Sequence, residues 1–386
     1  MSAVPGRPQA SSHRSAQHEG TPMSTAPLAL RSITATPVLV PMKRPLWTSV
    51  QALRAAPLLL IDLQTEEGIV GRSYLFCYLG AAAKGIAAIV DDLSTRWRGR
   101  ALVPATLRKD FADYSRLIGQ RGIVSMAGAG IDMAVWDALA LAAGQPLVRL
   151  LGSEPRAIKA YNSNGLGLIA PQAAADEALQ LLESGFTGVK MRLGRATAAA
   201  DLAAVRAVRQ ALPADIALMA DFNQALTLRE ALHRGHLLDG EGLAWIEEPI
   251  RHDDYAGYAE LQRKLTTPIQ LGENFAGPKA MAAAIAAGAV GYAMPDAERI
   301  GGVSGWMDAS ALAYAHEIEL SSHLFPEVSV HLLAASPAAH WLEFVDWAEP
   351  LLQEPMQLQN GMATPNATPG TGLVWDDAAV ARYRMD

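Results

Sequence analysis

The sequence predicts an α+β domain followed by a parallel (β/α) barrel, and three observations lead to this fold class. After residue 30, three strand-like segments are followed by helical sequence, which is typical of an α+β domain. From residue 158, short apolar segments alternate about eight times with amphipathic helical ones, in units of about 25 residues. Most of these apolar segments end in a polar side chain that is capable of chemistry.

Length, charge and cysteine content limit the class of protein. A chain of 386 residues is expected to form about two domains. The net charge of −7 disfavours binding to nucleic acid or to an anionic membrane. The single cysteine, Cys77, excludes an intrachain disulfide, which fits the reducing cytoplasm. We therefore expect a cytoplasmic protein that has neither nucleic acid nor membrane as a partner.

Neither the N-terminus nor the longest apolar stretch predicts a membrane segment. Residues 1–29 are rich in Ser, Pro, His and Gly and lack the apolar run of a secretory signal, so we expect a disordered tail. The longest apolar stretch, residues 280–294, is shorter than the roughly 18 to 20 residues that a spanning helix needs. We expect it to be a buried helix that runs into a strand.

The first domain is expected to span residues 30–152. Residues 43–55 are expected to form a loop between the first two strands. From residue 82 to residue 151 the spacing of apolar residues becomes that of a helix. The strand candidates are residues 30–42, 56–65 and 69–76.

The barrel is expected to span residues 153–360, and residues 361–386 are expected to return to the first domain. In such a barrel the C-terminal ends of the strands converge on one mouth. The strand candidates begin at residues 158, 188, 216, 243, 268, 291, 318 and 340. The polar residues at the strand ends, about 20 to 27 residues apart, are Asp221, Glu247, Glu273, Asp296, His323 and Glu343.

Three of these residues have the chemistry of a metal site. Asp221, Glu247 and Glu273 follow three adjacent strands and offer only oxygen ligands, which suit Mg²⁺. The alternative is that each carboxylate is a solvated residue at the start of a loop. Three carboxylates at the matching ends of adjacent strands argue against this alternative.

Asp296 and His323 come from neighbouring strands and have the chemistry of a general base. A carboxylate bonded to one imidazole nitrogen fixes the tautomer and makes the other nitrogen a better base. On the second barrel strand, Lys190 and Arg192 are two residues apart and therefore face the same side. We expect both cations to face the carboxylate cluster and the anion that it binds.

Motifs along most of the chain resemble the enolase superfamily, specifically its mandelate racemase branch. The resemblance extends into the first domain through APLLLIDL, GRSYLFCY and AGAGIDMAVWDALA. The barrel motifs are KMR at 190–192, ADFNQ at 220–224, WIEEP at 245–249, LGEN at 271–274, MPDAERIGGVSGW at 294–306, SSHLF at 321–325 and AHWLE at 339–343.

The resemblance implies a capping α+β domain on a modified TIM barrel, (β/α)₇β, and a Mg²⁺ cofactor held by the three carboxylates. The substrate would be a small-molecule 2-hydroxycarboxylate whose α-proton is removed to give an enediolate. Lys190 and a protonated Glu343 would stabilise the charge on its oxygens. Asn223 would contact the substrate or the metal shell, and Glu248 would play a supporting part. Members of the family are commonly oligomers, so a homo-oligomer is expected.

Arg192 departs from the family pattern, because mandelate racemase has a second lysine there as the base on one face of the substrate. Removing a proton from arginine at pH 7 costs roughly 7 to 9 kcal/mol, against about 4 to 5 kcal/mol for an unperturbed lysine. Arginine is better suited to holding an oxygen anion. Either Arg192 still exchanges protons in a racemase, or His323 acts alone in the dehydration of an acid sugar.

The segment between the first two strands is expected to close over the substrate. Its apolar character suits an aryl or alkyl 2-hydroxy acid, although Lys43 and Arg44 beside it could serve a second anionic group. Ordinary packing between the domains would explain the same residues. The expected apolar substrate contacts are Leu46, Trp47, Val50, Leu53, Tyr78 and Leu324, together with Phe76.

These observations leave three functions open. The breadth of the resemblance favours a racemase or epimerase of an aryl or apolar 2-hydroxy acid. The alternative is a dehydratase that uses His323 as its only base. A carboxylate-binding sensor without turnover is the third, and it is disfavoured because the metal set and the Asp296–His323 pair are complete.

Overall fold

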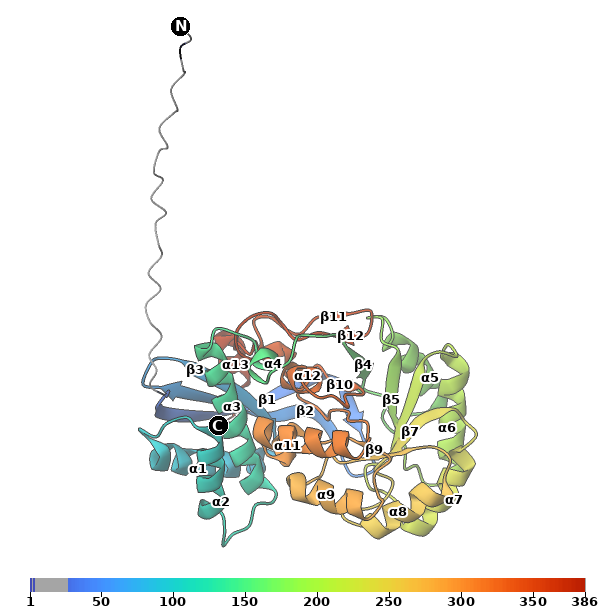
Figure 1. Cartoon of the computed structure of the whole chain (residues 1–386). Coiled ribbons are helices and arrows are strands. Elements are labelled where there is room, and N and C mark those ends of the chain that lie inside the picture. The colour runs from blue at the N-terminus through green and yellow to red at the C-terminus, as the bar shows by residue number, and fades with distance from the viewer. Residues whose placement is uncertain (2, 4–26, 386) are drawn as a thin grey trace.

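The computed structural model describes residues 1, 3 and 27–385, which form a capping domain beside a barrel (Figure 1). The predicted tail, residues 1–29, therefore lies almost entirely outside the described residues. The predicted fold class is confirmed, since a three-stranded sheet with helices precedes a parallel barrel.

The capping domain is an antiparallel meander, in the order β1-β2-β3, covered by helices. Its strands are β1 (Leu30–Trp47), β2 (Ala52–Thr65) and β3 (Val70–Phe76). Its helices are α1 (Gly80–Trp97), α2 (Pro104–Tyr114), α3 (Ile123–Ala142) and α4 (Leu147–Leu150). Helix α3 is long and apolar enough to cross a membrane, but 67% of its apolar window is buried. It packs on β3 and α1 as the core helix of this domain.

The expected loop at residues 43–55 is wrong, because most of this segment is a β-hairpin. Strand β1 continues to Trp47 and pairs with β2 through Leu46 to Leu53 and Trp47 to Ala52. The register shifts between Pro41 and Leu46, where Pro41 and Pro45 lack the N–H groups that a regular ladder uses. Because the two prolines interrupt the strand pattern, the sequence predicted a loop where the structure has a bent hairpin.

The barrel closes when β10 pairs in parallel with β4. The seventh strand position is reduced to isolated bridges, including those from Leu320 to Ala293 and Ala339. The eighth strand, β10, is followed by a short 3₁₀ helix and not by a barrel helix, so the barrel is a modified (β/α)₇β. The strands are β4 (Ile158–Asn162), β5 (Gly188–Arg192), β6 (Ala217–Asp221), β7 (Leu243–Glu247), β8 (Ile269–Leu271), β9 (Tyr292–Ala293) and β10 (Leu342–Phe344).

Helices surround the barrel strands, as Figure 1 shows for α5 to α9. The apolar stretch at residues 280–294 is a helix that runs towards a strand, as predicted. The helices are α5 (Pro171–Gln180), α6 (Ala198–Ala211), α7 (Leu228–Leu238), α8 (Tyr255–Lys264), α9 (Pro278–Ala286), α10 (Ala297–Ile300), α11 (Gly302–Ala315) and α12 (Pro326–Ala334).

The C-terminal segment contacts both domains. Thr371 bonds to Asp137, and the Trp375 indole donates to Asp62 at 3.0 Å, so the last residues lie against the capping domain. The elements here are η1 (Glu349–Leu351), β11 (Leu358–Gln359), β12 (Met362–Ala363) and α13 (Asp377–Tyr383). Strand β12 pairs with β4, so the segment leaves the barrel a few residues later than the expected boundary at 360.

Candidate active site

A layer of buried charged side chains lies above an aromatic layer inside the barrel. Tyr161 and Trp245 belong to the aromatic layer, and the Lys190 ammonium lies 5.7 Å from the centre of the Tyr161 ring. Parallel pairing sets Arg192 beside Asp221 and Asp221 beside Glu247. The register of β5, β6 and β7 therefore brings these charges together at the mouth.

Lys190 is bonded to the carboxylates around it. Its Nζ lies 2.5 Å from Glu247 Oε1, 2.6 Å from Glu343 Oε1 and 3.5 Å from Asp221 Oδ2. Burial alone would lower the pKa of Lys190, but the negative charges of Glu247 and Glu343 outweigh it and raise the pKa. Lys190 is therefore a cation that can neutralise negative charge on a bound ligand.

Glu343 differs from its expected form, which was protonated. Its Oε2 accepts the Leu324 N–H at 3.0 Å, and its Oε1 faces Lys190. Burial raises its pKa, but Lys190 and His323 have the larger combined effect and lower the pKa to about 2. In this arrangement Glu343 is ionised, because it stands between two cations.

The three carboxylates predicted to bind metal lie at the ends of adjacent strands. Among the described residues, no three side chains form a ready-made metal cage, because Lys190 bonds to Glu247 and His323 to Glu273. Burial and the neighbouring acids, first Asp221, raise the pKa of Glu247 to about 8 even though Lys190 opposes this. This crowding of negative charge and the all-oxygen donor set both fit a hard divalent cation.

Buried acceptors beside this cluster also lack partners. Asn223 Oδ1 and Glu248 Oε1 have no hydrogen-bond donor among the described residues. Asn223 donates through Nδ2 to Asp221 at 3.1 Å, so its amide extends the oxygen-rich region around that carboxylate. Unpaired buried oxygens are costly, so these atoms are consistent with a site that receives a cation and a ligand.

The predicted pair of Asp296 and His323 is present in the structure. Asp296 Oδ2 lies 2.5 Å from His323 Nδ1, and the other ring nitrogen lies 3.1 Å from Glu273 Oε2. Burial alone would lower the pKa of His323, but Glu273 and Glu343 raise it well above its usual value. His323 is held in one orientation, and Nε2 points towards the carboxylates at the mouth.

Arg192 is buried but has few partners. Its side chain is 5% exposed, Nη2 donates to Ser163 at 3.3 Å, and Nη1 lies 3.5 Å from Asp221. Neither Nε nor Nη1 has a hydrogen-bond partner among the described residues. Burial alone would lower the pKa of Arg192, but Asp221 and Glu343 outweigh it and raise the pKa. Arg192 is a fixed cation with two free donor groups.

Five of these residues, Arg192, Asp221, Asn223, Glu273 and His323, line a cavity of about 240 Å³ between the hairpin of the capping domain and the barrel mouth. Trp47, an expected contact, is not among the described residues that line it. Side chains alternate along a strand, so Leu46 faces the cavity while Trp47 lies against Gly167 and Arg54. The lining residues are Leu46, Thr48, Val50, Gln51, Leu53, Phe76, Tyr78, Arg192, Asp221, Asn223, Gln224, Glu273, Asn274, Arg299, His323, Leu324 and Trp347.

Several residues of the site were not predicted from the sequence. The Arg299 guanidinium lies 4.9 Å from the centre of the Tyr78 ring and bonds to the Asn274 amide. Asn274 donates to Glu248 at 2.8 Å and to Glu273 at 3.1 Å. Both lie in motifs of the family resemblance, since Asn274 ends LGEN and Arg299 belongs to MPDAERIGGVSGW, and these motifs are the signal that could have indicated them.

The loops at the mouth adopt left-handed backbone conformations. Asn223, Gln224, Glu248 and Leu324 have φ between 33° and 62°. Such values are uncommon outside glycine and cluster at functional sites. This conformation lets the N–H of Leu324, the residue after His323, donate a hydrogen bond to the Glu343 carboxylate.

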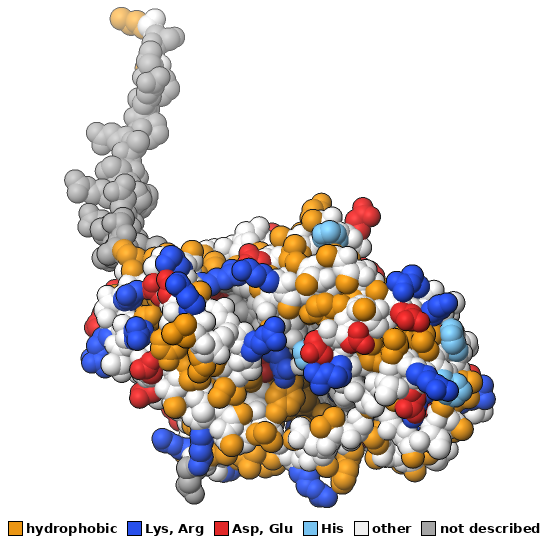
Figure 2. Space-filling view, turned by 90° about the horizontal axis from the view of Figure 1, so that it is seen from below, with side chains coloured by type: hydrophobic (Ala, Val, Ile, Leu, Met, Phe, Trp, Pro, Cys, Tyr) orange, Lys and Arg blue, Asp and Glu red, His pale blue; other side chains and the backbone are white. Residues whose placement is uncertain are grey.

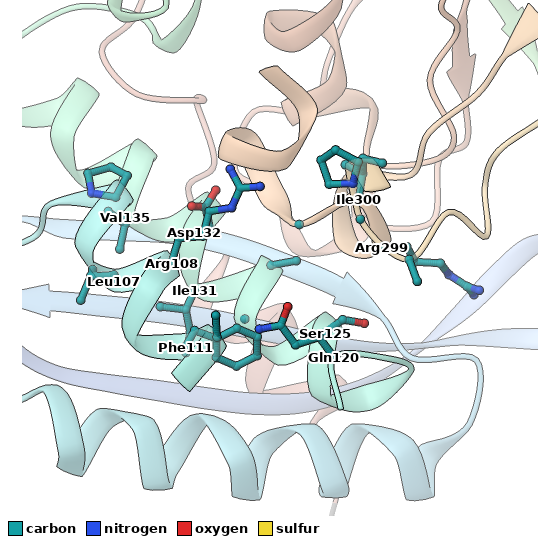
Figure 3. Close-up of a pocket in the computed structure, with 18 of the residues that line it drawn as sticks. Leu107, Arg108, Phe111, Gln120, Ser125, Ile131, Asp132, Val135, Arg299 and Ile300 are labelled. Carbon is teal, nitrogen blue, oxygen red and sulfur yellow. The ribbon is translucent and has the colours of Figure 1, made fainter. Parts of the chain in front are cut away.

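A second cavity, of about 280 Å³, lies between two pairs of helices. Helices α2 and α3 line one side, and the start of α9 and the end of α10 line the other. Figure 3 shows Asp132, Arg108 and Phe111 around it, with the Arg299 side chain at its edge and pointing away from Phe111. None of the predicted catalytic or metal-binding residues lines this cavity. The chemistry is therefore concentrated in the cavity at the barrel mouth.

Two family models match the chain. Residues 31–152 match the N-terminal domain of mandelate racemase / muconate lactonizing enzyme, and residues 173–379 match the enolase C-terminal domain-like family. The chain belongs to the mandelate racemase branch of the enolase superfamily. The resemblance noted in the sequence is thereby confirmed.

Known relatives of this enolase-superfamily enzyme differ in their ligands. L-talarate/galactarate dehydratase of Salmonella typhimurium is 30% identical over 85% of this chain and 82% of its own. A magnesium-bound enolase from the alphaproteobacterium BAL199 is 45% identical with TM-score 0.91, over 93% of this chain and all (100%) of its own. A Bradyrhizobium enolase with magnesium and mandelic acid is 40% identical with TM-score 0.90, over 94% and 100%. The expected Mg²⁺ cofactor is confirmed by these magnesium-bound relatives.

Proposed function

We propose that this enzyme dehydrates a 2,3-dihydroxycarboxylate with His323 as its only base. The observation that carries the proposal is that only one of the two positions expected to hold a base has a side chain suited to that role. His323 is an imidazole bonded to Asp296 at 2.5 Å, and the charge that most raises its pKa is that of Glu273, a proposed metal ligand. The residue in the second lysine position is Arg192, a guanidinium that stays protonated throughout the physiological pH range. A group that stays protonated does not serve as the second base that racemisation needs.

Asp221, Glu247 and Glu273 would hold Mg²⁺, which supplies Lewis-acid stabilisation of the substrate carboxylate. Lys190 adds positive charge on the same side. His323 Nε2 accepts the α-proton, and the resulting enediolate expels the hydroxyl from the β-carbon. The proton on His323 passes to that hydroxyl, which leaves as water. The enol product tautomerises to a 2-oxo-3-deoxy acid, so no oxidant or further reactant is consumed.

Racemisation of an aryl 2-hydroxy acid is the second candidate. One observation favours it, since the Bradyrhizobium relative contains mandelic acid. The curated relative with the dehydratase name favours elimination instead. Arg192 supports elimination by a physical argument that does not depend on either name.

Mandelate is a useful probe because it has an α-proton but no hydroxyl on the β-carbon. In D₂O with Mg²⁺, proton NMR is expected to show deuterium exchange at the α-carbon of one enantiomer only, without inversion. Interconversion of both enantiomers would contradict the single-base proposal. Loss of the α-proton signal in neither enantiomer, with binding retained, would favour the sensor.

We propose a cytoplasmic homo-oligomer that acts on a small-molecule substrate. Acidic and basic side chains are interspersed over the face shown in Figure 2, which agrees with a small-molecule partner rather than a polyanion.

A further inference from the structure

The cavity at the barrel mouth has a charged half and an apolar half. The charged half contains Arg192, Asp221, Glu273 and His323. The opposite half is formed by side chains of the hairpin, of β3 and of the loops after the last barrel strands. Its apolar members are Leu46, Val50, Leu53, Phe76, Leu324 and Trp347. The Phe76 and Trp347 rings lie 4.9 Å apart, so this half includes an aromatic surface.

Lys43 and Arg44, the cations expected to serve a second anionic group, are already paired. Lys43 lies 3.1 Å from Asp346 and 2.8 Å from Glu349, and Arg44 lies 3.4 Å from Glu177. Neither cation lines the cavity. The expectation that they could serve a second anionic group is therefore not supported by the structure.

Arg299 is the remaining cation of the cavity wall apart from Arg192. Its guanidinium lies over the Tyr78 ring at 4.9 Å and bonds to Asn274, which is itself bonded to Glu273. Its Nε has no hydrogen-bond partner among the described residues but lies 3.8 Å from Glu298 Oε1, a buried carboxyl group outside the cavity wall. The guanidinium is therefore held between Asn274, Tyr78 and Glu298. A carboxylate at the far end of a substrate would have to lie against apolar side chains, which is costly without a paired cation.

Arg192 has donors to offer, but in the charged half. Its Nη1 lies 3.5 Å from Asp221, and both Nε and Nη1 lack partners among the described residues. Donors fixed in this position meet oxygen atoms close to the reacting carbons rather than at the far end of the substrate.

We infer that the substrate is a 2,3-dihydroxy monocarboxylate whose far end is apolar, and that Arg192 binds the oxygen on its third carbon. This inference rests on the proposed dehydration and narrows its substrate class. It excludes the diacids for which L-talarate/galactarate dehydratase is named, because their second carboxylate would meet the apolar half.

A matched pair of substrates tests this inference. 2,3-Dihydroxyhexanoate and 2,3-dihydroxyhexanedioate have the same length and differ only in the terminal group. With Mg²⁺ and each diastereomer, formation of the 2-oxo-3-deoxy acid is followed by semicarbazide absorbance and NMR. We expect kcat/KM for the monoacid to exceed that for the diacid by about a hundredfold.

The outcomes separate this inference from the proposed function. Preferred turnover of the diacid overturns the inference but keeps the single-base dehydration. Exchange of the α-proton without a 2-oxo product from either compound overturns the dehydration as well.

Two variants sharpen the test. Val50 lies at the exposed turn of the hairpin and lines the cavity, so Val50→Arg adds a cation without burying it. We expect this change to raise kcat/KM for the diacid at least tenfold. Lys43→Ala, which removes a cation outside the cavity, is the matched control and should leave both substrates unaffected. Loss of diacid turnover in Lys43→Ala would show that a second carboxylate does reach Lys43.

Discussion

Arg192 shows how one side chain can change the chemistry of a shared site. It occupies the same face of β5 as Lys190 and reaches the same carboxylate, Asp221, at the same distance of 3.5 Å. Lysine there could lose its proton, whereas the guanidinium keeps its charge and offers a rigid set of donors. In the proposed function, the exchange of one cation for another therefore preserves the positive charge in the cluster but removes a base.

The variant Arg192→Lys is expected to restore a second base. Removing a proton from lysine costs several kcal/mol less than from arginine. Deuterium exchange at the second mandelate enantiomer should rise at least about tenfold above the wild-type rate, as measured by NMR in D₂O. Arg192→Gln is the control, since it shortens the side chain without supplying a base. Equal exchange in both variants would contradict this account.

The sequence was sufficient to place the charged residues of the mouth but not those that support them. Asp221, Glu247 and Arg192 follow from the strand register, because residues at the ends of parallel strands must meet. Trp47 was misplaced because the sequence did not reveal which side of the bent hairpin faces the cavity. Arg299 lies on the short helix α10 and packs on the Tyr78 ring. No hydrophobic periodicity in the sequence predicts this packing.

Helix α10 joins the Asp296–His323 pair to the capping domain. Asp296 is its N-cap and accepts the Glu298 N–H at 2.7 Å. The buried carboxyl of Glu298 accepts the Phe76 N–H of β3 at 2.9 Å. Burial, together with the charge of Asp296, raises the pKa of Glu298 well above its usual value. The Glu298 carboxyl thus joins β3, which carries Phe76 of the aromatic surface, to the helix that begins at Asp296.

Replacing Glu298 tests this connection. Glu298→Ala leaves the Phe76 N–H unsatisfied, so we expect a loss of about 1–3 kcal/mol in the free energy of unfolding. Glu298→Gln keeps an acceptor oxygen for the Phe76 N–H and should cost less than about 1 kcal/mol. Urea unfolding of both variants measures the difference. An equal loss in the two would mean that a charge, rather than an acceptor, is needed at this position.

The two domains are also joined by a buried histidine away from the mouth. His331 of α12 accepts the Val148 N–H of α4 at 3.3 Å. Burial lowers its pKa from 6.5 to about 4. Between these values the unfolded chain binds a proton that the folded chain does not, so acid favours unfolding. The contribution of His331 to stability is therefore present above pH 6.5 and is lost as the pH falls towards 4.

Stability at low pH is expected to depend on His331. Its share of the loss between pH 6.5 and pH 4 should be about 3 kcal/mol, from the shift in pKa. His331→Gln keeps an acceptor for Val148 but does not titrate, so its stability should fall less steeply with acid. Urea unfolding at a series of pH values compares the two proteins. Parallel curves for both would rule out this role.

The most direct test of the single-base account is deuterium exchange by His323→Asn. The variant removes the imidazole but leaves Lys190, Arg192 and the three candidate metal ligands in place. Each enantiomer of mandelate is incubated with this variant and Mg²⁺ in D₂O, with binding checked separately by calorimetry. The account predicts that neither enantiomer exchanges its α-proton although both still bind. Exchange that persists in one enantiomer would show that Arg192 is a base and would contradict the account.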